Sequence, residues 1–437
     1  MTIIIAGAGR VGFRLARTLS PKHDVIIMDQ NEEALKRLNE SIDALTLYAN
    51  VEDPRSYEAL KGKTYDFFIA VTDSDEINLV CSLIADEKIL VKRKIIRLKN
   101  QFFAKSSIAS KIGITDAVFP FNTVAESVKS LALNPIANNV KCFKGFPQKL
   151  ISIRANTPNT QPVLLSSLAS ESVNIIGVDR GGDFFIPDAQ ELLQPNDVIF
   201  CFGTPEAIQA LGEKLQNAPA RKNRCGVIFG ANTLGIEIAK ALIESGMTIK
   251  LIEKDLGLCT QASQLLQANA TVINSKYGDY RLYQEEGLAN ADILIAATAN
   301  DNENIVKCIE AKELGIRRVI AINNDIEHYR LMHSLGIIAL RGPKMNAFYA
   351  IMEIINSNVM VEERHFCGGS ALSFVRRFEK VPFSLSKNPA PEALIFYMQH
   401  NHLYTSFQAL NPDEPFTLFA FAKRIYEEGV RTWINIL

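Results

Sequence analysis

The sequence lacks the features of several large protein classes. No apolar run approaches the roughly 20 residues that a membrane-spanning helix needs. The apolar residues 3–6 lead into a glycine loop with no basic segment before them, unlike a secretory signal. The 47 basic and 48 acidic residues give a formal net charge of -1, so there is no surplus of Lys and Arg for nucleic acid. We therefore expect a cytoplasmic protein that neither inserts into a membrane nor binds nucleic acid.

Cysteine is also scarce, and its spacing excludes a cross-linked scaffold. The seven cysteines are an odd number, lie far apart and include no C-x-x-C pair. A disulfide framework or a usual zinc ribbon requires closely spaced pairs. We expect reduced and mostly buried thiols.

One segment of the chain occurs twice. Residues 3–12 (IIIAGAGRVG) align with residues 226–235 (GVIFGANTLG) at an offset of 223. Residues 66–72 (DFFIAVT) align with residues 292–298 (DILIAAT) at an offset of 226, which Asn78 and Asn304 keep. Several landmarks in one order indicate an internal repeat of a whole structural unit.

A different unit lies between the copies. Residues 174–179 have a strand pattern, Gly181 and Gly182 supply a hairpin turn, and residues 184–186 form the returning strand. Residues 198–202 form a further apolar strand, and residues 218–223 (APARKN) have the composition of a linker. Residues 411–421 (NPDEPFTLFAF) are a weak echo of residues 195–202 (PNDVIFCF), without the Gly-Gly hairpin.

These patterns predict an α/β protein with two Rossmann-like parallel-sheet domains, each followed by a small α+β module, the second of which is degenerate. We refer to the parts as the first Rossmann copy (1–135), the first C-type module (136–219), the second Rossmann copy (220–355) and the closing module (356–437).

The first glycine loop has the spacing of a dinucleotide-binding turn. Gly7 permits the tight turn, Gly9 lets the backbone approach a phosphate, and Gly12 lets the following helix pack close to the strand. The helix N-terminus then offers N–H groups and a partial positive charge to phosphates. Asp29 stands 22 residues after Gly7, where a carboxylate accepts hydrogen bonds from ribose hydroxyls and repels a 2′-phosphate. NAD or an adenine nucleotide therefore fits better than NADP.

The second glycine loop is weaker. Asn232 stands where the middle glycine belongs, and its side chain would crowd a pyrophosphate. Glu253 occupies the acidic position. We expect the second copy to bind nucleotide weakly or not at all.

The combination of motifs resembles one family. Residues 72–78 (TDSDEIN) follow a strand, and residues 180–188 read RGGDFFIPD. With the glycine loop and Asp29, these segments resemble the regulatory subunits of Trk potassium-uptake systems, which consist of tandem regulator-of-potassium-conductance (RCK) domains. The resemblance covers roughly residues 1–355 well and the closing module poorly.

The resemblance implies a nucleotide site for NAD(H), with ATP or ADP as alternatives. Thr72 and Asp73 match contacts near the adenosine, and Arg97 matches a basic residue that contacts phosphate, for which a guanidinium is well suited. Ala49 and Asn50 replace a glycine-containing turn of the family, so binding is altered there. The site residues are Gly7, Ala8, Gly9, Arg10, Val11, Gly12, Asp29, Ala49, Asn50, Thr72, Asp73 and Arg97.

The second copy departs further from the family. Ala321 and Asn323 are aligned with Arg97 and Lys99, and residues 275–276 (Ser-Lys) replace a usual Gly-Asp pair. With Asn232, these exchanges remove the phosphate contacts from the second copy.

The resemblance also implies partners and a place in the cell. Such domains pair, so we expect a homodimer or homotetramer on a membrane-embedded potassium transporter subunit (TrkH- or TrkG-like), at the cytoplasmic face of the inner membrane. Residues 121–131 fit the crossover helix of that pairing, and an ordinary terminal helix is the alternative. An RCK-type regulator of a different transporter is an alternative to this expectation.

A dehydrogenase is the remaining alternative. It would need a proton donor beside the nicotinamide. Of the six histidines only His23 belongs to the first copy, and residues 362–367 (EERHFC) are too sparse for a metal site. Because the sequence has neither a nucleophile motif nor a P-loop, we expect a sensor and not an enzyme.

Overall fold

The computed structural model describes residues 1–104, 106–143, 145–155, 163–216, 223–278, 281–325, 328–356, 361–386 and 392–437. The expected linker lies outside the described residues, except for Asn223. The chain divides into two compact units. Unit 1 is Met1–Val124 with Arg341–Ile355, and unit 2 is Ala125–Leu340 with Asn356–Leu437. None of the helices in these described ranges is long and apolar enough to cross a membrane.

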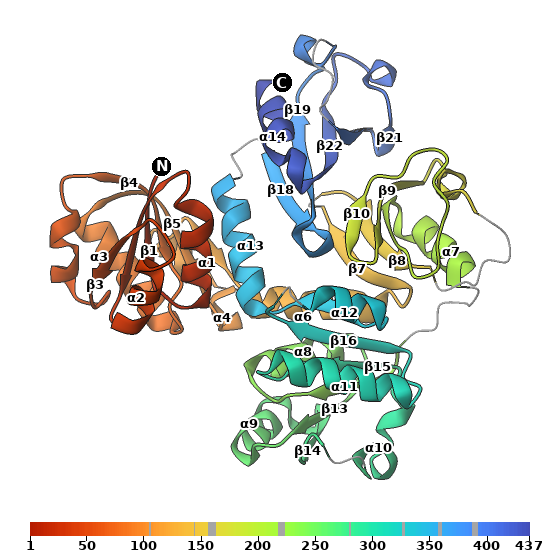
Figure 1. Cartoon of the computed structure of the whole chain (residues 1–437), viewed down its shortest axis with the longest axis horizontal. Coiled ribbons are helices and arrows are strands. Elements are labelled where there is room, and N and C mark those ends of the chain that lie inside the picture. The colour runs from red at the N-terminus through yellow and green to blue at the C-terminus, as the bar shows by residue number, and fades with distance from the viewer. Residues whose placement is uncertain are drawn as a thin grey trace. The chain divides into compact units, whose positions relative to one another are not determined.

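The first Rossmann copy is built on a six-stranded sheet in the order β3-β2-β1-β4-β5-β6, with parallel neighbours (Figure 1). The side chains of residues 3–6 are fully buried, because helices cover both faces of such a sheet. Its elements are β1 (Thr2–Ala6), α1 (Arg10–Leu19), β2 (Asp24–Asp29), α2 (Glu32–Asn39), β3 (Leu45–Tyr48), β4 (Thr64–Ala70), α3 (Asp75–Lys88), β5 (Leu90–Arg97), α4 (Gln101–Ala104), α5 (Ile108–Lys111), β6 (Asp116–Val118) and α6 (Pro120–Leu133).

The second Rossmann copy repeats this sheet in the order β14-β13-β12-β15-β16-β17. The internal repeat of the sequence is therefore a repeat of one fold. Its elements are β12 (Cys225–Phe229), α8 (Thr233–Ile243), β13 (Thr248–Glu253), α9 (Leu256–Leu266), β14 (Ala270–Asn274), α10 (Arg281–Glu285), β15 (Ile293–Ala296), α11 (Asp301–Glu313), β16 (Arg318–Asn323), α12 (Tyr329–Ser334), β17 (Ile338–Arg341) and α13 (Pro343–Asn356).

The two Rossmann copies exchange their last helices. Helix α13 follows the sixth strand of the second copy but packs in unit 1, where Phe348 and Ile351 share a core with Val11 and Leu15 of α1. Helix α6 of the first copy belongs to unit 2 from Ala125 onward. There the buried Arg318 guanidinium of β16 donates to the Leu131 carbonyl at 3.1 Å. The crossover predicted for residues 121–131 is thus present within one chain.

Both C-type modules contain a five-stranded sheet with one topology. The orders are β10-β9-β11-β8-β7 and β21-β20-β22-β19-β18, so each strand has a counterpart in the other module. The first contains β7 (Ala137–Cys142), β8 (Lys149–Arg154), β9 (Val173–Arg180), β10 (Asp183–Phe185), β11 (Val198–Gly203) and α7 (Pro205–Gln216). The closing module contains β18 (Val361–Phe366), β19 (Ala371–Phe378), β20 (Ala393–Gln399), β21 (His402–Tyr404), β22 (Phe416–Lys423) and α14 (Glu427–Ile436).

The hairpins of the two modules turn on different residues. Gly181 and Gly182 have φ values of 62° and 95°, as expected for the β9–β10 turn. In the closing module His400 and Asn401 take φ values of 53° and 65° in the β20–β21 turn. The hairpin that the sequence does not signal there is therefore present, and the divergence of this module affects its turn residues more than its topology.

The two C-type modules share one aromatic core in unit 2. The Phe202 ring of β11 lies 5.1 Å from the rings of Phe419 and Phe421 of β22, between ring centroids. Phe200 and Phe366 make a further contact between the modules at 5.3 Å. Because such rings bury large apolar areas, this core holds the two sheets together.

A buried polar cluster joins the first C-type module to the second Rossmann copy. The fully buried Asp179 carboxylate of β9 accepts a hydrogen bond from the Tyr329 hydroxyl of α12 at 2.9 Å. His333, one turn further along α12, has its Nε2 at 3.9 Å from Asp179 Oδ1. Burial lowers the pKa of His333, the nearby Arg154 lowers it further, and Asp179 partly opposes both.

This burial predicts that acid destabilises unit 2 through His333. The unfolded chain binds a proton near the ordinary pKa of 6.5, whereas the folded chain resists protonation. The His333 contribution is therefore complete above pH 6.5 and is lost as the pH falls, by up to about 1.4 kcal/mol per pH unit. His333→Gln should flatten the dependence of the urea midpoint on pH between about 7 and 5, while the exposed His402→Gln leaves it unchanged. Equal slopes for His333→Gln and the parent would contradict this assignment.

Candidate functional site

The three glycines of the first loop meet different physical requirements. Gly7 has a φ of 110°, which side chains other than glycine rarely adopt. A Cβ on Gly12 would lie 1.9 Å from the Gly7 carbonyl oxygen, so Gly12 is required for helix–strand packing. Gly9 has an ordinary φ of −66°, and a Cβ there would meet nothing within 4 Å. The fold itself does not require glycine at position 9.

Gly9 also leaves the N-terminus of α1 open. It is the N-cap residue, and it has no side chain that could accept a hydrogen bond from the first N–H groups of the helix. Arg10 is exposed beside it, whereas Val11 is buried. A helix N-terminus with free N–H groups and open space beside it can bind an anionic group.

Asp29 lies directly beside this loop. Its Oδ2 accepts a hydrogen bond from the Ala8 amide at 2.6 Å, and its Oδ1 accepts one from the Asn31 amide at 2.8 Å. The carboxylate is half-buried. Asp29 therefore closes the loop onto the end of β2, and a carboxylate at the end of this strand can accept hydrogen bonds from a ribose.

The turn after β3 reaches the same edge of the sheet. The Ala49 amide donates to the Asp29 carbonyl at 3.0 Å, and the exposed Asn50 accepts a hydrogen bond from the Glu52 amide at 3.0 Å. The Asn50 side chain therefore closes this turn, which contains no glycine.

The segment after β4 lies on the other side of the loop. A Cβ on Gly7 would lie 3.0 Å from the Thr72 amide nitrogen, so the two loops are adjacent. The Asn78 amide fixes Thr72, because its oxygen accepts from the Thr72 hydroxyl at 2.8 Å and from the Thr72 amide at 2.9 Å. This position, between β1 and β4, is where strand order reverses in the sheet and where open α/β sheets bind ligands.

Arg97 completes the edge at the end of β5. Its side chain is buried, and its Nη1 lies 3.4 Å from Asp73 Oδ1, whose own side chain is exposed. Burial lowers the pKa of Arg97, and Asp73 partly offsets this. The alternative of a solvated charge at a strand end is wrong. All twelve residues predicted for the site lie at the carboxyl ends of β1–β5, in the loops that follow them or in the first turn of α1.

The corresponding edge of the second copy is closed by its own side chains. Asn232 caps α8, and its Oδ1 accepts from the amides of Leu234 and Gly235 at 2.9 and 3.2 Å. Glu253 is buried and accepts from the Ala231 amide and the Tyr277 hydroxyl, each at 2.8 Å. The sequence did not single out Tyr277, because an aromatic residue after a strand has no motif.

One alignment between the copies is corrected by the strand register. Ala70 faces Ile96, and its counterpart Ala296 faces Ala321. Ala321 therefore corresponds to Ile96, and the counterpart of Arg97 is the buried Ile322 and not Ala321. Lys99 corresponds to Asn324 and not to Asn323, because the chain between β15 and β16 is one residue shorter than between β4 and β5. With either alignment, the second copy has no basic residue at the position of Arg97.

The Thr–Asn clamp is common to both copies. Asn304 accepts from the Thr298 hydroxyl at 2.8 Å and donates to the Ile322 carbonyl at 2.8 Å, as Asn78 does toward Thr72 and the Arg97 carbonyl. This motif therefore holds the sheet edge together and does not by itself distinguish a ligand-binding copy.

A cluster in the closing module has the residue types of a metal site, but an arginine pairs with its carboxylates. Glu363, His365 and Glu427 offer ligand atoms within 4.8 Å of one another. Arg431 donates to both Glu363 oxygens at 2.9 Å and also pairs with Glu427. Because the Arg431 guanidinium already pairs with both carboxylates, the cluster is an ion-pair network between β18 and α14.

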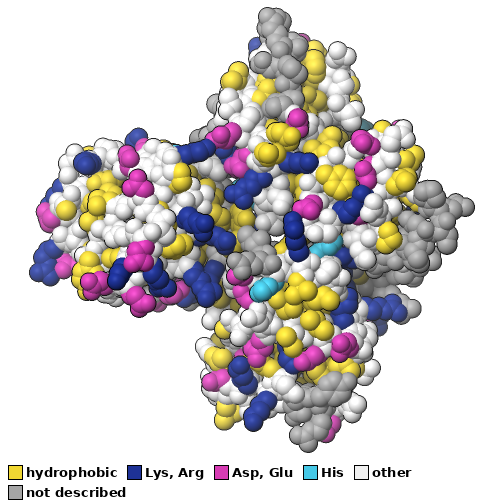
Figure 2. Space-filling view, in the orientation of Figure 1, with side chains coloured by type: hydrophobic (Ala, Val, Ile, Leu, Met, Phe, Trp, Pro, Cys, Tyr) yellow, Lys and Arg dark blue, Asp and Glu magenta, His cyan; other side chains and the backbone are white. Residues whose placement is uncertain are grey.

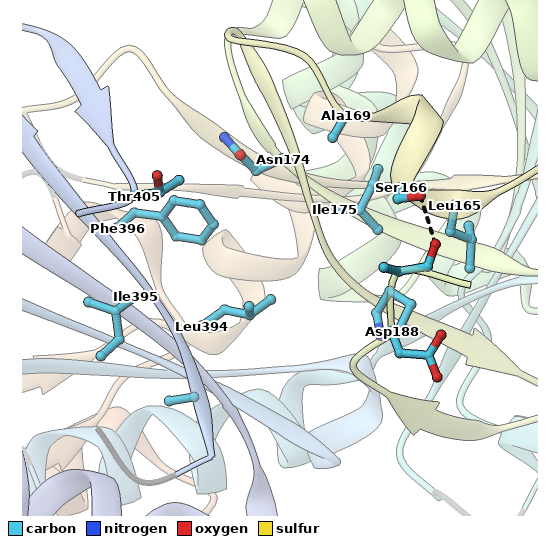
Figure 3. Close-up of a pocket in the computed structure, with 13 residues that line it drawn as sticks. Leu165, Ser166, Ala169, Asn174, Ile175, Asp188, Leu394, Ile395, Phe396 and Thr405 are labelled. Atoms are coloured by element: carbon cyan, nitrogen blue, oxygen red, sulfur yellow. Dashed lines mark hydrogen bonds between the residues drawn. The ribbon is translucent and has the colours of Figure 1, made fainter. Parts of the chain in front are cut away.

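A cavity of about 560 Å³ lies between the two C-type modules, with β9 on one side and β20 on the other (Figure 3). Ile175 and Phe396 give it apolar walls, and Asp188 lies beside Ser166, whose hydroxyl donates to the Ala189 carbonyl at 2.9 Å. None of its thirteen lining residues is basic. A cavity with a carboxylate and no cation repels phosphates, which makes it a poor site for a nucleotide.

Basic and acidic side chains both occur across the face shown in Figure 2. All seven cysteines are thiols, and five of them are buried, as predicted.

Comparison with known proteins identifies the family. The TrkA-N domain family matches residues 3–120 and 226–340, which together are more than half of the chain, and the TrkA-C domain family matches residues 163–216. The chain belongs to the TrkA family. The resemblance inferred from the motifs is therefore confirmed, and the closing module is matched by neither domain description, as its divergence predicts.

Several curated proteins are similar over most of their length. A Trk system potassium uptake protein TrkA homolog of Archaeoglobus fulgidus is 26% identical, with 90% of each chain covered. The trkA homolog 1 of Methanosarcina mazei is 27% identical over 79% of this chain and 86% of its own. The TrkA of Halomonas elongata is 25% identical over 85% and 82%.

Solved structures show the same fold. The GsuK RCK domain matches all of this chain and 95% of its own with a TM-score of 0.63, at 15% identity. A GsuK channel bound to NAD matches with a TM-score of 0.62, also at 15% identity, over 100% of this chain and 79% of that one. The tandem RCK architecture expected from the sequence is thus confirmed.

Proposed function

We propose that this TrkA-family chain is a nucleotide-sensing regulatory subunit of a potassium transporter and is not an enzyme. One observation carries the nucleotide part: Gly9 leaves the N-terminus of α1 uncapped, and open space lies where its side chain would be. A glycine that neither conformation nor packing requires is explained by a ligand that approaches the backbone. Asp29 supplies the ribose contact, and Arg97 the phosphate charge.

The ligand is NAD(H), with ATP or ADP as alternatives. Relatives in structure include GsuK bound to NAD and GsuK bound to ADP, and the site of this chain has the groups for either. Asp29 favours an unmodified ribose over a 2′-phosphate. The twelve residues predicted for the site remain our assignment of its contacts.

Helix α13 offers a route from the ligand to the rest of the chain. The ligand would lie at the N-terminus of α1, and α1 packs against α13 through Val11, Leu15 and Phe348. The Arg14 guanidinium lies over the Phe348 ring at 5.6 Å. Because α13 comes from the second copy, a shift of α1 on binding acts on a segment that continues into unit 2.

The partner in this proposal is a membrane-embedded potassium transporter subunit, TrkH- or TrkG-like, which holds the protein at the cytoplasmic face of the inner membrane. The curated relatives are named as potassium uptake proteins. A switch from about 1:99 to 99:1 needs roughly 5.5 kcal/mol of differential binding. If this free energy is shared among the four sites of a homotetramer, each site needs to supply only about 1.4 kcal/mol. We also propose that the four domains of this subunit end at residues 135, 219, 355 and 437.

We expect purified chain to form a dimer or tetramer without any membrane subunit. RCK domains pair in the family, and the exchanged helices α6 and α13 show that these domains pack through their last helices. Multi-angle light scattering at micromolar concentration, with and without NAD, measures the mass. A monomeric mass under both conditions would contradict the oligomer.

Titration calorimetry tests the nucleotide site. NADH, NAD, ATP and ADP should reveal about one tight site per chain. Asp29→Ala should remove it, because the carboxylate both closes the loop and contacts ribose, whereas Glu253→Ala should leave it in place. Loss of the tight site in Glu253→Ala but not in Asp29→Ala would mean that the second copy is the sensor.

The same samples separate the sensor from an oxidoreductase. NADH absorbance should stay constant with a panel of carbonyl compounds, because the site offers no side chain placed as a proton donor. Steady oxidation that Gly9→Val abolishes would establish the oxidoreductase. If nucleotide binds but a potassium transporter subunit does not co-purify with the chain, a different transporter is the client.

A further inference from the structure

The two copies differ at one position in the loop that lies next to the acidic residue, Asp29 in the first copy and Glu253 in the second. Asp29 pairs in register with Tyr48, and Glu253 pairs with Asn274. Three residues beyond these positions, the first copy has Val51 and the second has Tyr277. The counterparts therefore occupy one place in the fold but carry an aliphatic side chain in one copy and a phenol in the other.

Tyr277 takes the contact that a ribose would make. Its hydroxyl donates to Glu253 Oε2 at 2.8 Å, and its side chain is buried against Phe229 with ring centroids 5.7 Å apart. Burial, together with Glu253, raises the pKa of Tyr277, so the hydroxyl stays protonated as a donor. In the first copy, two backbone amides are the only recorded donors to the Asp29 carboxylate among the described residues.

Asn232 takes the contacts that a phosphate would make. Its Oδ1 accepts from the amides of Leu234 and Gly235, which are the counterparts of Val11 and Gly12. Its Nδ2 donates to the Ala297 carbonyl at 2.8 Å, which fixes the side chain across the loop. The N–H groups that α1 leaves for a ligand are thus satisfied internally in α8.

A third exchange holds Tyr277 in place. The buried Lys307 of α11 donates to the Tyr277 carbonyl and pairs with Glu310. Its counterpart in α3 is Cys81, which is buried and has no positively charged group to donate such a hydrogen bond. A buried ammonium is retained only where it has partners, so the Lys307 contact argues that the Tyr277 loop is fixed.

We propose that the second Rossmann copy contains a built-in replacement for its nucleotide, with Asn232 in the place of the phosphate and the Tyr277 hydroxyl in the place of a ribose hydroxyl. The second copy then stays in one ligand-like conformation, and only the first copy responds to nucleotide. This inference rests on the proposed nucleotide site of the first copy, because it assigns the same ligand class, an adenine nucleotide, to the latent second site.

Reopening the second site tests the inference. The triple variant N232G/Y277V/I322R restores the residues of the first copy at three exchanged positions, including the counterpart of Arg97. In titration calorimetry with ADP and with NAD, we expect the stoichiometry to rise from about one to about two per chain. Adding Glu253→Ala to the triple variant should return it to about one, and adding Asp29→Ala instead should remove the original site and leave the new one.

The outcomes separate this inference from the proposed function. A folded triple variant that still binds one nucleotide per chain overturns the inference and leaves the function intact. Parent protein that binds no nucleotide overturns the function. Either single variant, Asn232→Gly or Tyr277→Val, should stay near one, because the other side chain still fills its half of the site.

Hydrogen exchange on the parent protein gives a second test that needs no variant. Without nucleotide, a peptide covering residues 230–236 should exchange slowly, because Asn232 already binds its amides, while the counterpart peptide 7–13 exchanges faster. Saturating ADP should slow the first-copy peptide and leave the second-copy peptide unchanged. Slowing of both peptides by ADP would overturn the inference.

Discussion

Gly9→Val should reduce the affinity for NAD and ADP by at least about a hundredfold while the chain remains folded. The Cβ and its methyl groups would enter the open space beside α1 and displace the phosphate from the helix N–H groups. Losing two hydrogen bonds to a charged group costs about 1.5–3 kcal/mol each, and every 1.4 kcal/mol is about a tenfold change. Titration calorimetry measures the affinity, and circular dichroism follows the fold.

The space around Gly9 explains why stability should change little. No heavy atom lies within 4 Å of a Cβ at this position, and exchanging an N-cap glycine for valine costs on the order of 1 kcal/mol. Gly12→Ala differs, because its Cβ would overlap the Gly7 carbonyl oxygen and destabilise the copy. Undiminished affinity in Gly9→Val would remove the observation on which the proposed function rests.

The second copy supplies the matched control. Asn232→Ala alters the counterpart of Gly9 and removes a side-chain cap that accepts two hydrogen bonds. We expect it to cost about 0.5–2 kcal/mol of stability and to leave nucleotide affinity unchanged. Gly9→Val in the first copy should thus lower the nucleotide affinity, and Asn232→Ala in the second copy should lower the stability. A general effect of loop mutation would change both quantities in both variants.

Local chemistry explains how much of the site the sequence could predict. The glycine loop and Asp29 lie within one β-α-β segment, where spacing alone sets the geometry. Arg97 was placed correctly for the first copy because it ends a clear apolar strand. Its counterpart was misplaced by one residue, because the loop before β16 changed length and only the strand pairing of Ala296 with Ala321 reveals the shift.

Contacts between distant segments lie beyond such reasoning. Tyr277 and Glu253 meet only because two parallel strands end at one edge, and no local pattern marks the pair. The sequence signalled strands in both C-type modules, but it did not show that their apolar faces pack on each other. His400 and Asn401 adopt positive φ in a hairpin where the expected glycines are absent, since Asn tolerates this region better than most residues.

The shared core of the C-type modules leads to the second large effect. Phe202→Ala should destabilise unit 2 by about 3–5 kcal/mol. The fully buried ring contacts Phe396, Phe419 and Phe421 of the closing module and Phe143 of its own module, with centroids 5.1–5.8 Å apart. Truncation leaves a cavity that a packed aromatic cluster fills only in part, so the lost contacts and the cavity both contribute.

The single tryptophan reports this change from the other side of the sheet. Trp433 of α14 packs with Leu418 and Ala420, whose neighbours Phe419 and Phe421 point to the shared core. Tryptophan fluorescence during urea unfolding should therefore show an earlier transition in Phe202→Ala. Leu192→Ala, at an exposed position of the first C-type module, should shift it by less than about 0.5 kcal/mol. An unchanged transition in Phe202→Ala would mean that the closing module is stable without the first, and that the two sheets do not unfold as one body.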